Sequence, residues 1–310
     1  MTAPDPRPVL LAVGSEPGSD AALRFAGQET LSRGCPLVLL HCYLVLPTGP
    51  ETALLEFAKA EEVARSTLRG ATEHAKDLLG SVVPVSSRLV REAAVRAVVD
   101  ASEHAQLVVL ERPQRPHLTR LLTRSTSNGV AAHAHSPVVV VPEEWAGAAG
   151  GDVVVGVDVP ERCEAILVQA LAEARARHTS LRVVHTSWSP GYFDGTGVSP
   201  ASNPRWAEEA TAKIRAVLDG LGDEAAGVPV SVDISYDRPA DALAEASATA
   251  GLVVVGRHDP LVPSGSHLGP VARTLLRAAR CPVLLVAPSP AHRGWPRGAR
   301  RTVADAGPLA

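Results

Sequence analysis

The feature that most constrains the fold is an internal repeat that runs through nearly the whole chain. Four apolar segments of the first half return in the second half: PVLLAVG (8–14) as DVVVGVD (152–158), PLVLLH (36–41) as SLRVVH (180–185), LVVL (107–110) as LVVVG (252–256), and SPVVVVP (136–142) as CPVLLVAP (281–288). They keep one order and recur at intervals of 144 or 145 residues. The chain therefore contains a tandem duplication.

Each half alternates short apolar runs with amphipathic segments. In the first half the strands are expected at 9–13, 37–41, 83–90, 107–110 and 138–141, and the helices at 20–32, 51–79, 92–104 and 125–134. Runs of Val and Leu without polar alternation are typical of strands that are covered on both faces. With right-handed crossovers, this pattern predicts an α/β fold of two doubly wound five-stranded parallel-sheet domains in tandem.

Composition sets the boundaries of these domains. The segment EEWAGAAGGD at 143–152 is rich in Gly and Ala, which is typical of a linker. We expect domains at 1–145 and 152–288, joined by a linker at 146–151. The tail at 289–310 has no apolar periodicity and is expected to be disordered.

Charge and cysteine usage exclude several classes of protein. A formal net charge of −3 gives no general attraction to nucleic acid or to an anionic membrane. The start of the chain lacks a basic segment followed by a long apolar one, and no run approaches the length of a membrane span. The four cysteines form no CxxC pair and no zinc-like spacing, so we expect reduced thiols in a cytoplasmic protein.

Four motifs together resemble the universal stress protein family. They are a first strand ending in V-D, an apolar strand ending in His, a loop similar to G-x-x-G-x(9)-G-[ST], and a closing C-P-V-L-L-V run. The resemblance covers residues 5–145 and 151–288. It implies an adenine nucleotide alpha-hydrolase-like sheet that binds ATP in some members, over the carboxyl ends of the strands.

In the second half the resemblance assigns a role to two residues at strand ends. Asp158 matches the family aspartate that contacts the ribose and adenine side of the nucleotide. Thr186 stands where the backbone reads the edge of the adenine, and backbone readout tolerates a change of side chain.

The glycine loop of the second half is only partly kept. Gly256 and Gly269 match its first and third glycines, and both would let the main chain approach phosphate oxygens. Val255 and Val271 adjoin the two ends of the loop and complete the candidate nucleotide site. The neighbouring Arg257 is a candidate for a compensating contact with phosphate.

Two substitutions oppose phosphate binding in this loop. Asp259 replaces the second glycine and puts a negative charge beside a polyanion, unless a magnesium ion bridges the two. Pro270 replaces the expected Ser or Thr, which removes a hydroxyl and a backbone N–H donor. The implied cofactor is therefore ATP, with magnesium as a candidate companion.

The first half departs further from the nucleotide motif. Gly14 stands where the second half has Asp158, Leu110 replaces the first glycine, and Arg124 replaces the third. Ser125 is kept from the phosphate motif. We expect no ATP in this half.

Two functions remain open. One is a non-enzymatic stress-response module that binds ATP or another adenine nucleotide in its second half, with slow hydrolysis left open. The other is a nucleotide-free interaction or scaffold protein of the same fold. In both, the halves are expected to pair within the chain through the apolar last strands, VVVV and VLLV, and a homodimer is compatible with either.

Overall fold

The predicted α/β fold is confirmed. The computed structural model describes residues 5–14, 20–45, 49, 51–112, 121–147, 150–186, 204–257 and 268–286, without the side chains of 121–125 and 204. In the first half the elements are β1 (Val9–Val13), α1 (Ala21–Arg33), β2 (Leu37–Cys42), α2 (Ala53–Leu79), β3 (Val85–Val90), α3 (Ala94–Ser102), β4 (Leu107–Arg112), α4 (Leu121–His133) and β5 (Val138–Pro142).

The second half repeats this order, and three of its four described α-helices are shorter than their counterparts in the first half. Its elements are β6 (Val153–Val157), α5 (Glu164–Ala176), β7 (Leu181–Thr186), α6 (Pro204–Gly220), β8 (Val230–Ser235), α7 (Pro239–Ala246), β9 (Leu252–Gly256), α8 (Pro270–Ala278) and β10 (Val283–Val286), with short 3₁₀ turns at Pro160–Arg162 and Gly222–Glu224. Predicted and observed ends differ by a few residues, most at α4, which begins four residues before its expected start at 125. In the described part of the chain no helix is long and apolar enough to cross a membrane.

The strands of both halves form a single ten-stranded sheet. Its order is β3-β2-β1-β4-β5-β10-β9-β6-β7-β8. Within each half every pairing is parallel. In the first half, successive strands are added to one side of β1 and then, from β4 on, to its other side. The second half does the same at β6 and β9, so each half is doubly wound.

The two halves meet at an antiparallel pair of strands. Val138, Val139 and Val140 of β5 lie opposite Leu285, Leu284 and Val283 of β10. Val139 and Leu284 are equivalent in the repeat, so a local twofold axis passes between them. The carboxyl ends of the strands therefore lie at opposite ends of the sheet in the two halves.

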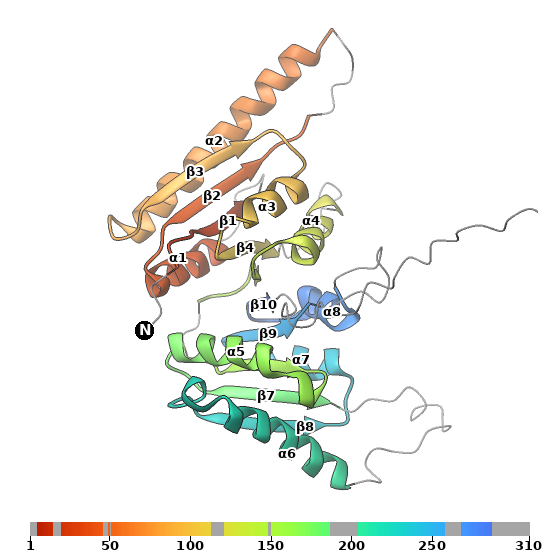
Figure 1. The fold of residues 1–310 in the computed structure, drawn as a ribbon. Coiled ribbons are helices and arrows are strands. Elements are labelled where there is room, and N and C mark those ends of the chain that lie inside the picture. The colour runs from red at the N-terminus through yellow and green to blue at the C-terminus, as the bar shows by residue number, and fades with distance from the viewer. Residues whose placement is uncertain are drawn as a thin grey trace, which may run out of the picture.

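Helices cover both faces of the sheet (Figure 1). One core cluster joins the sheet to α1, α2, α5 and α6, and a second joins it to α3, α4, α7 and α8. Successive strand residues point to opposite faces, so Val139 belongs to the first cluster and Val140 to the second. The apolar runs that identified the strands in the sequence are thus buried on both sides.

A network of two buried carboxylates and two partly buried arginines joins α1 to α5 across the local axis. Arg33 pairs with Glu29 at 2.8 Å on its own helix and with Glu173 of the other half at 2.9 Å. Arg177 likewise pairs with both carboxylates. Burial by itself lowers the pKa of Arg33, but the two carboxylates outweigh it and the pKa is raised. Each half contributes the same Glu-x-x-x-Arg pattern, and the arginine of each pattern pairs with the glutamate of the other half.

Removing one member of this network is expected to destabilise the chain strongly. Glu173→Ala would leave Arg33 and Arg177 short of a partner at a site where the carboxylate is only 4% exposed. Breaking a buried pair in this way costs about 3–5 kcal/mol. The loss is measured as a lower urea midpoint of unfolding.

Glu61→Ala is the matched control, because Glu61 pairs with Arg65 on the exposed side of α2. Its midpoint should stay close to that of the parent chain. Equal effects of the two substitutions would contradict a structural role for the buried network.

Candidate functional site

Three of the predicted site residues lie at one edge of the sheet. β7, β6 and β9 are neighbours, and their carboxyl ends place Thr186, Asp158 and Gly256 side by side along that edge. Asp158 and Gly256 are exposed and Thr186 is half-buried. The edge includes the point where the strand order reverses, which is where doubly wound sheets offer a crevice to ligands.

A histidine fixes the geometry of this edge. The Nδ1 atom of His185 lies 2.8 Å from the carbonyl oxygen of Val157. Because a carbonyl only accepts, Nδ1 carries the proton, and the bond links the ends of β7 and β6 directly beside Thr186 and Asp158. His41 makes the same contact with Val13 in the first half, at 2.9 Å.

The backbone conformation does not require glycine at either of the two loop positions kept from the motif. A Cβ at Gly256 would meet only Ile166 Cδ1 at an ordinary 3.8 Å. Gly269 precedes α8 with φ of −66°, which any residue adopts. Close approach of a ligand to the main chain is a physical reason for glycine at both places.

The remaining predicted site residues divide into three groups. Val255 is buried in the core and pairs with Leu285 of β10, and half-buried Val271 packs against the same core cluster. Pro270 is exposed at the first position of α8, so the predicted loss of an N–H donor falls at the start of that helix. Asp259 lies outside the described residues.

The guanidinium of Arg257, a candidate for a contact with phosphate, is engaged with the other half of the chain. Its guanidinium donates hydrogen bonds to the carbonyl oxygens of Ala134 (2.5 Å) and Ser136 (2.7 Å), just beyond the end of α4 in the other half. The residue is 8% exposed, and burial lowers the pKa of its guanidinium to about 10, so it remains a cation at neutral pH. The main chain that follows Gly256 is thereby tied to the first half.

Arg257→Ala is expected to lower stability by about 2–4 kcal/mol, since hydrogen bonds from a charged group are worth about 1.5–3 kcal/mol each. Arg112→Ala is the matched comparison. Arg112 is the equivalent residue of the first half, and its side chain pairs with Glu144 of its own half and is 14% exposed. Urea denaturation of both variants should show the larger loss for Arg257→Ala, and the reverse order would contradict a cross-half role.

The strand registers correct the comparison of the two loops. Val108 pairs with Val138 in the first half as Val253 pairs with Val283 in the second. Glu111, not Leu110, therefore stands where the second half has Gly256. The match of LVVL (107–110) with LVVV (252–255) does not reveal this equivalence, because both segments end one residue before the glycine position. The first half thus carries a carboxylate at the first glycine position, and the side chains of Arg124 and Ser125 lie outside the description.

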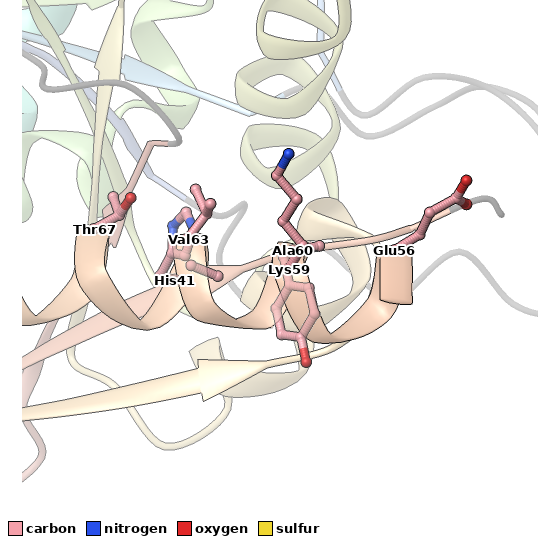
Figure 2. Close-up of a pocket in the computed structure, with 8 residues that line it drawn as sticks. His41, Glu56, Lys59, Ala60, Val63 and Thr67 are labelled. Atoms are coloured by element: carbon pink, nitrogen blue, oxygen red, sulfur yellow. The ribbon is translucent and has the colours of Figure 1, made fainter. Parts of the chain in front are cut away.

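A hollow of about 380 Å³ lies in the first half, and nothing in the sequence had indicated it. Figure 2 shows its walls, which come from the end of β2 and from the first turns of α2: His41, Tyr43, Glu56, Lys59, Ala60, Val63, Ala64 and Thr67. In the second half the corresponding histidine, His185, instead packs against the Trp206 ring, with centroids 5.4 Å apart.

The described residues offer little for metal or thiol chemistry. No group of three His, Cys, Asp or Glu residues among them could hold a metal ion. Burial raises the pKa of the thiols of Cys42 and Cys163 to about 11 and that of Cys281 to about 12. These thiols are therefore protonated at neutral pH and lack the thiolate that a nucleophile needs.

Comparison with known proteins gives the same assignment for both halves. The model of the universal stress protein family matches residues 6–142 and 151–287. A universal stress protein of Mycolicibacterium smegmatis is 31% identical over 291 residues, covering 90% of this chain and 97% of its own. One from Mycobacterium tuberculosis is 31% identical over 292 residues, covering 89% and 96%.

The fold is also similar to a solved structure. A universal stress protein from Archaeoglobus fulgidus matches with a TM-score of 0.64 at 17% identity, covering 93% of this chain and 98% of its own. With a duplicated doubly wound sheet, a family match in each half and relatives that share nearly its whole length, this chain belongs to the universal stress protein family.

Proposed function

We propose that this protein is a stress-response module that binds an adenine nucleotide at the carboxyl edge of its second half. The observation that carries the proposal is the meeting of Asp158, Thr186 and Gly256 at the ends of three neighbouring strands. An exposed carboxylate there can accept hydrogen bonds from ribose hydroxyls. Exposed main chain at Gly256 can face phosphate oxygens.

The proposed role is non-enzymatic, with ATP as the nucleotide. Occupancy of the edge would change the affinity of the protein for a partner. The tie from Arg257 to Ala134 and Ser136 supports this, because it links the main chain beside Gly256 to the other half. Magnesium has a specific part in the proposal, which is to offset the charge that Asp259 brings near the phosphates.

A second candidate function is a nucleotide-free scaffold, and Pro270 favours it. The first helical position of α8 has no N–H to offer a phosphate. The first half, with Glu111 at the first glycine position and Gly14 in place of the aspartate, fits this role in either case.

Isothermal titration of ATP into the full chain, with and without magnesium, tests the proposal. We expect one site, weakened about tenfold or more by Asp158→Ala, since a hydrogen bond to a charged acceptor is worth about 1.5–3 kcal/mol. Gly269→Arg should abolish binding by filling the approach to the main chain.

Asp219→Ala is the control, because this exposed carboxylate lies near the last residue of α6, far along the helix from the ligand edge. It should bind ATP as the parent chain does. No heat from the parent chain under either condition would reject nucleotide binding and leave the scaffold function.

A further inference from the structure

A second hollow of the first half, of about 460 Å³, lies between α3 and the sheet, and we call it the α3 groove. Its floor includes Leu40 of β2, which is buried, and Val38 of β2 and Val90 of β3, which are only half-buried. Its helix wall presents the small side chains of Ala97 and Ala101. The groove therefore offers apolar surface that the described residues do not fully cover.

The same strip of sheet is charged in the second half. The strand pairings put Arg182 at the position of Val38 and Asp233 at the position of Arg88. The Nε atom of Arg182 donates a hydrogen bond to the carboxylate of Asp233, so the stem of the arginine crosses the sheet from β7 to β8. Such a pair suits a strip of sheet that faces water, whereas a valine at the same place leaves the strip apolar.

The charged residues of the groove leave one cation free to meet a ligand. Arg88 of β3 lines the groove and is exposed, and in the described part of the chain no carboxylate lies within ion-pair distance of it. The walls also include three carboxylates that each lie within 4.0 Å of a basic side chain: Glu92 and Asp100 beside Arg96, and Glu103 beside His135. The charge of the walls that lacks a partner is therefore positive.

We propose that the α3 groove binds a small carboxylic acid with an apolar body, such as a medium-chain fatty acid, with its carboxylate at Arg88 and its body over Val38 and Val90. In the second half, an arginine stem covers this strip and its cationic head meets Asp233. The first half lacks that stem and has a cation in place of the acid, so the complementary molecule ends in an anion. The volume of the groove falls within the range of about 300–1,000 Å³ typical of small-molecule sites.

The α3 groove is separate from the proposed nucleotide site and does not depend on it. The nucleotide edge is formed by strand ends of the second half, whereas the groove lies in the first half, on the face of the sheet that carries α3. The hollow beside His41 is lined by α2, which packs on the opposite face. Binding of an apolar acid can therefore be measured with or without ATP.

Titration of decanoate into the full chain, followed by calorimetry and by ligand-observed NMR, tests the proposal. We expect saturable binding at one site, and weaker binding of decylamine, which has the same apolar body and the opposite charge. Arg88→Gln should weaken decanoate binding about two- to fivefold, the range expected for one partly exposed ion pair. Arg69→Gln removes an exposed arginine of α2, on the other face of the sheet, and is the matched control that should bind decanoate as the parent chain does.

Two further variants copy the second half into the first. Arg88→Asp gives this position the charge of its counterpart and should reverse the preference, so that decylamine binds more tightly than decanoate. Val38→Arg combined with Arg88→Asp rebuilds the whole pair and should abolish binding of both molecules, because the new arginine stem would cover the floor. Val38 is half-buried and Arg88 is exposed, so neither change enters the fully buried core.

Several results would each overturn the proposal. They are the absence of saturable decanoate binding to the parent chain, equal effects of Arg88→Gln and Arg69→Gln, and a preference for decanoate that persists in Arg88→Asp. Unchanged binding to the double variant would also contradict it, since the floor would then not be the binding surface. Displacement of decanoate by ATP would place the acid at the nucleotide edge instead of the α3 groove.

Discussion

The pairing of β5 with β10 is the constraint on which the rest of this structure depends. Each half ends in a short and wholly apolar strand that would be an open, sticky edge if the half stood alone. Antiparallel pairing buries both edges at once and makes one sheet from two. Because the strands meet about a local twofold axis, each half presents the same surface to the other. The residues of one half that lie at this axis must therefore be complementary to the equivalent residues of the other half.

The charge network shows how closely the repeat meets this requirement. Glu29 and Arg33 are repeated as Glu173 and Arg177, and each arginine bridges the carboxylates of both halves. Away from the axis the halves are free to differ. Arg257 donates hydrogen bonds to two carbonyl oxygens of the other half, whereas its equivalent Arg112 forms an ion pair with Glu144 of its own half. The antiparallel junction also puts the candidate nucleotide edge of the second half and the hollow of the first half beside His41 at opposite ends of the sheet.

Sequence reasoning succeeded where the signal was local and repeated. Runs such as 107–110 and 252–256 predicted buried parallel strands because only covered strands lack polar alternation, and the fold followed. It failed where the answer depended on contacts between distant elements. The direction of the Arg257 side chain is set by carbonyls 121 and 123 residues away in the chain. The equivalence of Glu111 in the first half with Gly256 in the second follows only from the strand pairings, which align the two halves residue by residue.

Amide hydrogen exchange on the full chain tests the central claim that β5 and β10 make the two halves one structural unit. If they do, the amides of both strands exchange slowly, through the same global opening as those of β1 and β6 in the middle of each half. Exchange in β5 and β10 that is much faster than in β1 and β6 would show that the halves separate while each remains folded. That result would contradict a continuous sheet.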